Sequence, residues 1–167
     1  SSKGSNGGTS DTLAISLNSG FGTYPQSLCP YNEVKKGFSE TLRYYSDYRL
    51  KDYSEISNNK DTLKSKIVSN GAVTVYYPSI TDCYSSDYAN YYSDNTCIGI
   101  GDSHLIVVIG WDDNYSKDNF NGKVKPSNDG AWLCKNSWGE HYGNDGYIWI
   151  SYDTTNLAFS QYIMQDN

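Results

Sequence analysis

The chain has 167 residues, about the length of one domain, which is enough to bury a hydrophobic core. Hydrophobic residues make up 37% and charged residues 19% of the sequence, and the longest apolar run, residues 105–109, is far shorter than the roughly 20 residues of a membrane-spanning helix. The 13 Lys and Arg against 19 Asp and Glu give a net charge of −6 without a basic stripe. This composition excludes a membrane span and argues against nucleic-acid binding.

Two short helices are predicted in the first 70 residues. Residues 9–19 place apolar side chains behind a Ser or Asp cap and stop at Gly20. Residues 61–70 place Leu63, Ile67 and Val68 on one face before Gly71. Residues 20–59 are rich in turn formers and have weak periodicity, so no element is predicted there.

Strands are predicted in the rest of the chain. Five β-branched and aromatic segments are separated by clusters of Gly, Asn, Asp and Ser: residues 72–77, 104–111, 131–138, 146–152 and 157–164. A polar insertion, residues 114–129, is predicted to be a loop between two of them. Helices followed by strands favour an α+β fold with an antiparallel, barrel-like sheet in the C-terminal half.

The four cysteines are Cys29, Cys83, Cys97 and Cys134. No pair has the two-residue spacing of a zinc or redox motif, so a metal site is not expected. Cys83 and Cys97 bracket a polar, tyrosine-rich stretch, and a disulfide closing it would stabilise the fold by about 3 kcal/mol and imply an oxidising compartment. Two unpaired thiols in a surface loop are an equal alternative, because connectivity cannot be deduced from the sequence.

The sequence has two histidines, which shortens the search for a general base. His104 begins an apolar segment, and Asn136 follows 32 residues later on the next predicted strand. Neighbouring antiparallel strands can bring the two side chains together, so that the Asn oxygen fixes the imidazole tautomer while Trp138 excludes water. For an arbitrary pair, a core histidine and a turn asparagine would be the commoner explanation.

The residues around this pair strongly resemble a known family. SHLIVVIGWDD and AWLCKNSWGEHYGNDGYIWIS are similar to the His and Asn segments of the papain-like cysteine peptidases, in particular bacterial members. The KNSWG run followed by YGNDGY is highly specific. Upstream, residues 5–31 resemble the family's Cys-Asn-Gly-Gly segment, helix and Tyr-Pro-Tyr turn, and NGAVTVYY resembles its Gly-Pro-Val strand. Recognisable pieces extend over roughly residues 5–152.

The resemblance implies a role for each matching residue and no metal or organic cofactor. His104 would be the base, Asn136 its orienter and Trp138 the shield over both. An extended peptide would lie along the bare backbone of two glycines, beside a pocket for the second residue before the scissile bond. The bulky Tyr76 would make this pocket shallow, and the carboxylate of Asp102 would favour a basic substrate side chain. The implied glycines are Gly7 and Gly8, and the implied pocket residues are Ser10, Tyr76, Asp102 and Leu105.

The sequence also departs from the family pattern. It contains neither the Cys-Gly-x-Cys-Trp segment that carries the nucleophile nor the upstream oxyanion-hole glutamine. Cys29 matches the turn region, and Cys134 is predicted to be a small buried hydrophobe. Ser5 stands where the family has a cysteine that forms a disulfide. His141 follows KNSWG in a variable turn and is predicted to be exposed rather than catalytic.

These features predict the heavy chain of a two-chain peptidase, whose light chain bears the catalytic cysteine and the glutamine. The opening SSKGSNGG, which has no signal-peptide pattern, is expected to be a cut end. Residues 1–45 would belong to the helical domain and residues 46–167 to the barrel-like domain. The family and the acidic, Tyr-rich surface imply a secreted or cell-surface location. The alternative is an inactive homologue that binds peptide or glycan through its Tyr- and Trp-rich surface.

Overall fold

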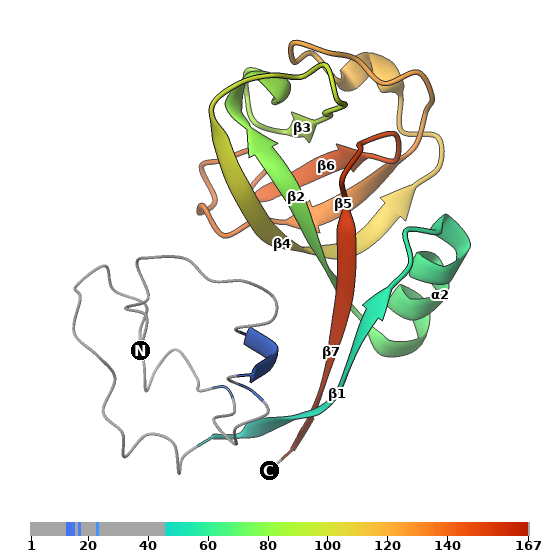
Figure 1. The fold of residues 1–167 in the computed structure, drawn as a ribbon, viewed down its shortest axis with the longest axis vertical. Coiled ribbons are helices and arrows are strands. Elements are labelled where there is room, and N and C mark those ends of the chain that lie inside the picture. The colour runs from blue at the N-terminus through green and yellow to red at the C-terminus, as the bar shows by residue number, and fades with distance from the viewer. Residues whose placement is uncertain (1–12, 16, 18–22, 24–45, 167) are drawn as a thin grey trace, which may run out of the picture. The chain divides into compact units, whose positions relative to one another are not determined.

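The computed structural model describes residues 13–15, 17, 23 and 46–166 (Figure 1). The chain divides into two compact units, Ser1–Ser54 with Tyr162–Asn167, and Glu55–Gln161. Most of the predicted helix 9–19 lies outside the described residues, although Leu13, Ala14, Ile15 and Leu17 are helical. The second unit, Glu55–Gln161, contains the predicted catalytic residues.

The described strands form one seven-stranded sheet in the order β1-β7-β2-β4-β5-β6-β3. Neighbouring strands are antiparallel in the pairs β2–β4, β4–β5, β5–β6 and β2–β7. The pair β3–β6 is parallel, so the sheet that was predicted to be antiparallel includes one parallel pair. The strand bounds are β1 Tyr48–Ile56, β2 Val73–Ile80, β3 Asn90–Tyr91, β4 Gly101–Asp112, β5 Ala131–Lys135, β6 Tyr147–Ser151 and β7 Ala158–Asp166.

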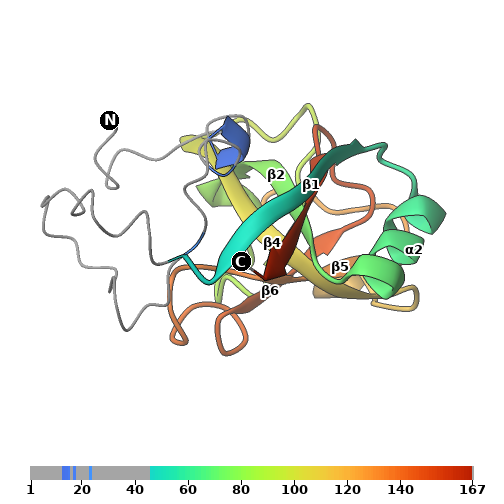
Figure 2. The same cartoon turned by 90° about the horizontal axis from the view of Figure 1, so that it is seen from below.

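The helix predicted at 61–70 is α2, Lys60–Asn70. The Asn59 side chain accepts a hydrogen bond from the Thr62 amide at 3.0 Å, which satisfies one of the unpaired donors of the first turn. Gly71 ends the helix with a φ of 87°, a conformation that glycine adopts without steric cost. The buried Gln161 side chain of β7 donates to the carbonyl oxygen of Gly71 at 3.1 Å. α2 packs against β2 and β4 (Figure 2).

The core face of the sheet follows the two-residue alternation of β2 and β4. Val73, Val75 and Tyr77 of β2 are buried, and they lie opposite Val108, Ile106 and His104 of β4, respectively. Because residues directly opposite in an antiparallel pair share a face, His104 lies on the core side of β4. β4 begins close against β2, since a Cβ atom at Gly101 would clash with the Ser79 carbonyl oxygen.

β1 is a strand that the sequence did not predict. Its residues, YRLKDYSEI, are mostly exposed and only Ile56 is buried. β1 is an edge strand at the end of the strand order. Because neither of its faces is well buried, its sequence lacks the alternation of apolar and polar residues that indicates a strand. The predicted segment 131–138 is also too long, because β5 ends at Lys135 and its last predicted residues form a turn.

The tyrosine-rich stretch between β2 and β4 is closed by a disulfide between Cys83 and Cys97. The disulfide is therefore the correct one of the two alternatives that the sequence left open. After the single 3-10 turn Thr81–Cys83, the loop returns on itself, with hydrogen bonds from Ser85 N to Asn90 O and from Tyr92 N to Cys83 O. The predicted loop 114–129 is confirmed, with one short 3-10 turn at Lys117–Asn119. Within the described residues, no helix is long and apolar enough to cross a membrane.

Candidate active site

Pairing of β4 with β5 brings the predicted catalytic pair together. Val107 of β4 lies opposite Lys135, the last residue of β5. His104 lies three residues before Val107, and Asn136 directly follows Lys135, so the register brings both residues to the same end of this strand pair. His104 Nε2 and Asn136 Oδ1 are 3.0 Å apart. The backbone amide of Asn136 donates to the Gly146 carbonyl oxygen at 2.9 Å, which holds the start of the turn in place.

Hydrogen bonding fixes the tautomer of the His104 ring. The Ser137 amide donates to Asn136 Oδ1 at 2.8 Å, and an N–H group requires an acceptor, so the atom facing both Ser137 and His104 is the carboxamide oxygen. His104 Nε2 must therefore carry the proton that it donates to this oxygen. In the neutral ring Nδ1 then keeps its lone pair, and no group in the described part of the chain hydrogen-bonds to it. This is the arrangement that a general base requires.

Trp138 packs against the His104 ring, and its predicted role as a shield over both residues stays a prediction. Its ring is stacked on the His104 ring with centroids 4.9 Å apart and an interplanar angle of 13°. On the core side, the Tyr77 ring approaches the imidazole edge-on at 5.8 Å. Asn136 itself is 8% exposed. Rings on both sides lower the local dielectric, which strengthens the bond between imidazole and carboxamide.

Behind Trp138 lies an aromatic wall that was not predicted from the sequence. Tyr84, Tyr88 and Tyr142 have ring centroids 5.8, 6.4 and 5.8 Å from that of Trp138. Two of these rings come from the disulfide-closed loop. Its tyrosine content, bracketed by two cysteines, was the available signal, but nothing in the sequence indicated which side of the loop would face the site.

The phenols nearest the site are held neutral by burial. Burial raises the pKa of Tyr84 to about 12 and the pKa of Tyr77 further still. Their hydroxyl groups lie 2.6 Å apart, and that of Tyr84 is also 2.8 Å from the Ser79 hydroxyl. These hydroxyls therefore join the base of the disulfide-closed loop to β2 without adding a charge next to His104.

The residues predicted to bind substrate are partly described. Tyr76 and Leu105 are cross-strand partners, and their positions in the alternation place them on the face of β2 and β4 opposite His104. Asp102 is exposed and lies opposite Ser79, so the register does not pair it with either of them. Gly7, Gly8 and Ser10 lie outside the described residues, and their predicted roles stay predictions.

None of the described cysteines is suited to act as a nucleophile. Cys83 and Cys97 are joined to each other, and Cys134 is a free thiol with 0% exposure. Burial raises the pKa of the Cys134 thiol far above its ordinary value, which disfavours the reactive thiolate. Cys29 lies outside the described residues. His141 is exposed in the turn after Trp138, as predicted.

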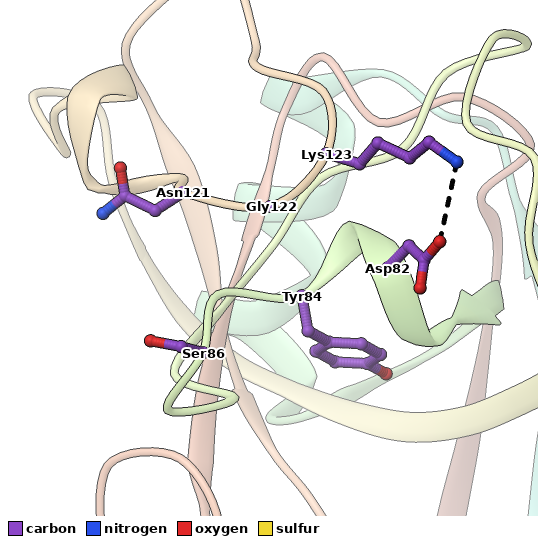
Figure 3. A pocket seen from close by; sticks show the side chains of 6 residues that line it. All are labelled: Asp82, Tyr84, Ser86, Asn121, Gly122 and Lys123. Carbon is purple, nitrogen blue, oxygen red and sulfur yellow. Dashed lines mark ion pairs between the residues drawn. The ribbon is translucent and has the colours of Figure 1, made fainter.

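A pocket of about 420 Å³ lies beside the disulfide-closed loop, and most of the residues that line it have polar side chains (Figure 3). Lys123 and Asp82 both line it and form an ion pair with an Nζ to Oδ2 distance of 3.5 Å. Tyr84 also lines this pocket, so the same ring belongs to the pocket wall and to the aromatic wall behind Trp138. The remaining lining residues are Ser86, Asn121 and Gly122.

Residues 1–165 match the family profile described as "Papain family cysteine protease". The chain is 29% identical to procathepsin L of Rattus norvegicus over 161 residues, and 26% identical to testin-2 of Mus musculus over 123 residues. These alignments cover 92% and 72% of this chain but 43% and 34% of the two relatives. The chain therefore spans less than half the length of either relative.

Two solved structures extend the comparison. The cysteine protease Cwp84, described as a surface layer associated protein of Clostridium difficile, is 30% identical with a TM-score of 0.80, covering 96% of this chain and 37% of that one. The bromelain protease from Ananas comosus, solved in complex with the E64 inhibitor, is 20% identical with a TM-score of 0.64, covering 94% of this chain and 70% of that one. The second comparison supports the fold alone.

Proposed function

Because the chain belongs to the papain family of cysteine proteases, we propose that it carries the base half of a Cys-His-Asn peptidase site. His104 is the general base and Asn136 the group that orients it. The observation that carries this proposal is the 3.0 Å contact between His104 Nε2 and an Asn136 oxygen whose identity the Ser137 amide fixes. That contact leaves Nδ1 as the ring nitrogen available to a thiol.

The chemistry assigned to His104 is proton transfer in acyl transfer to sulfur. Nδ1 takes the proton of the nucleophilic thiol, and the thiolate attacks the peptide carbonyl carbon. The imidazolium then donates this proton to the leaving amine as the carbon–nitrogen bond breaks and a thioester remains. Neutral His104 next removes a proton from water, whose oxygen attacks the thioester and releases the acid. Asn136 stabilises the charged ring through its oxygen in both steps.

The nucleophile in this proposal comes from polypeptide outside residues 1–167. A light chain bearing the cysteine and the oxyanion-hole glutamine is the partner proposed, with residues 1–45 completing the helical domain and residues 46–167 the barrel-like one. The burial of Cys134 and the pairing of Cys83 with Cys97 support an external thiol. An inactive homologue that binds peptide or glycan is the competing proposal.

The proposed substrate is an extended peptide, as the family implies. Asp102 is exposed near the start of β4, where its carboxylate can meet a basic side chain, and Tyr76 and Leu105 form a cross-strand pair on the opposite face of the sheet. A secreted or cell-surface location is proposed as well. The Cys83–Cys97 disulfide supports it, as does the surface-layer association stated for Cwp84.

The test is the peptidase rate of the assembled protein with each histidine replaced in turn. His104→Ala is expected to abolish turnover, because no other described group can take the proton from the thiol. His141→Ala is the matched control, since it removes an exposed imidazole from the neighbouring turn, and it is expected to leave the rate within a few fold. Activity in His104→Ala close to that of the unmodified protein would overturn the assignment. No activity in any form would favour the inactive homologue.

A further inference from the structure

We propose that the Cys83–Cys97 loop positions Trp138 over the catalytic pair, with Tyr84 and Tyr88 as its positioning residues. The inference rests on the proposed function, because it assigns the loop a part in the same site. It goes beyond that function by giving a role to an insertion that carries none of the predicted catalytic residues. Neither tyrosine contacts His104, so each acts through the indole.

Tyr88 lies among three aromatic rings. Its centroid is 5.2 Å from that of Tyr84, 6.4 Å from that of Trp138 and 6.1 Å from that of Tyr142. The contacts with Trp138 and Tyr142 are edge-on, with interplanar angles of 85° and 84°, which is a favoured geometry for aromatic pairs. Tyr84 adds a tilted contact with Trp138. The loop therefore contributes two ring contacts to the indole that stacks on His104.

The backbone of Tyr88 is in an uncommon conformation. Its φ is 58°, in the left-handed region that a bulky side chain rarely adopts because of steric strain. Strain of this kind persists where the surrounding structure determines it, and it often marks a functional position. Here the conformation is held by a hydrogen bond from the Tyr88 amide to the Ser85 carbonyl oxygen at 2.9 Å. It directs the ring toward Trp138 and Tyr142.

The loop is anchored at several points, so it can act as a fixed support. The disulfide closes it, and the Asp94 carboxylate accepts hydrogen bonds from the amides of Thr96 and Cys97. The Tyr84 hydroxyl is bonded to Tyr77 and Ser79 of β2. The Tyr91 hydroxyl donates to the Pro78 carbonyl oxygen. The first two anchors hold the loop closed, and the two tyrosine hydroxyls tie it to β2, the strand that pairs with β4 at His104.

A support of this kind keeps water away from the hydrogen bond between His104 and Asn136. Removing the Tyr88 ring frees one edge of the indole, so solvent reaches the Nε2 proton more often. A base that is less well oriented slows proton transfer, which lowers kcat more than it changes KM. Because the indole itself remains, the effect is smaller than the loss of Asn136.

The experiment compares Tyr88→Gly with Tyr88→Phe in the assembled protein. Glycine adopts the positive φ without strain, so Tyr88→Gly removes the ring without burdening the backbone, and Tyr88→Phe keeps the ring. Tyr92→Leu is the control for general loosening of the loop, because the Tyr92 ring packs with Phe120 and Ala131 in a separate cluster. The two readouts are kcat and KM on a peptide, and solvent exchange of the Nε2 proton in protein labelled with ¹⁵N-histidine. Two histidines make those spectra simple to assign.

Tyr88→Gly is expected to lower kcat and speed exchange of the His104 Nε2 proton, each by about tenfold, as for a lost supporting contact of an active site. Tyr88→Phe and Tyr92→Leu should leave both readouts within a few fold. Unchanged exchange in Tyr88→Gly, or an equal change in Tyr92→Leu, would overturn the positioning role. The failure of the proposed function would look different, because the unmodified protein would be inactive while the exchange measurement could still be made.

Discussion

The two ends of β4 use the same kinds of side chain for different purposes. Near its start, His104 stacks on Trp138 and donates to Asn136. At its other end, the Lys64 ammonium of α2 lies 5.6 Å from the centroid of the Trp111 ring and binds both oxygens of Asp113, at 2.5 and 2.8 Å. Each end therefore combines a basic group, an aromatic ring and one polar partner.

The two basic groups differ in whether they keep a lone pair that can accept a proton. Lys64 and the Tyr152 hydroxyl both donate to Asp113, so this cluster uses its polar groups to fix α2 against the end of β4. His104 has one nitrogen engaged and one ring nitrogen without a hydrogen-bond partner in the described part of the chain. A saturated set of contacts stabilises the fold, whereas an oriented group with a spare lone pair can do chemistry.

The largest effect among the further predictions is expected at Asn136. Asn136→Ala removes the acceptor that fixes the His104 tautomer, so the rate on a peptide should fall by about 10²-fold or more while the fold persists. The Nδ2 atom of Asn136 is buried without a hydrogen-bond partner, so its removal should cost little stability. Steady-state kinetics together with a thermal unfolding midpoint check both parts. A rate within a few fold of that of the unmodified protein would contradict the role of Asn136 in orienting His104.

The next effect concerns the Cys83–Cys97 disulfide, which closes the loop that packs against Trp138. Replacing both Cys83 and Cys97 with Ser opens a loop with a sequence separation of 14, and the free energy of unfolding should fall by about 3 kcal/mol. Denaturant unfolding followed by circular dichroism measures this. Equal stability with and without the bridge would show that the loop's hydrogen bonds alone hold it to β2. Lys64→Met provides the comparison at the opposite end of β4.

The smallest effect is expected for Lys64→Met itself. The Asp113 side chain is 56% exposed, and solvent screens the pair, so the loss should be no more than about 1 kcal/mol. Lys64 lowers the pKa of Asp113, and the pair therefore stabilises the protein above the unfolded pKa of about 3.9 and loses this contribution as the pH falls below it. The difference in free energy of unfolding between the unmodified protein and Lys64→Met should therefore be smaller at pH 3 than at pH 7. A large change in the peptidase rate of Lys64→Met would contradict the purely structural role that is assigned to the Lys64 end of β4.

The sequence predicted the proximity of His104 and Asn136 better than it predicted their surroundings. His104, Asn136 and Trp138 lie on segments with a highly specific motif, and pairing of β4 with β5 brings them together as expected. The helix at Lys60–Asn70 was also predictable, since its cap and its terminal glycine are local signals. Such features depend on neighbours in the chain, which a sequence displays directly.

Features set by tertiary contacts were predicted less well. β1 is largely exposed and shows no alternation, and β3 is a two-residue strand whose parallel pairing with β6 has no local signal. The contact of Tyr88 with Trp138 depends on how the disulfide-closed loop folds back. The pocket shared by Tyr76, Leu105 and Asp102 stays a prediction. The observed register places Tyr76 opposite Leu105 and Asp102 opposite Ser79.

The most direct measurement of the central claim is the identity of the cysteine that reacts with an active-site label. The assembled protein is treated with an iodoacetamide- or epoxide-based probe, its polypeptides are separated under denaturing and reducing conditions, and the modified residue is mapped. We predict labelling that parallels the loss of activity, on a cysteine outside residues 1–167, and slow labelling in His104→Ala. A small separate polypeptide carrying the label would establish the light chain. Stoichiometric, activity-linked labelling of Cys29, Cys83, Cys97 or Cys134 would contradict the external nucleophile.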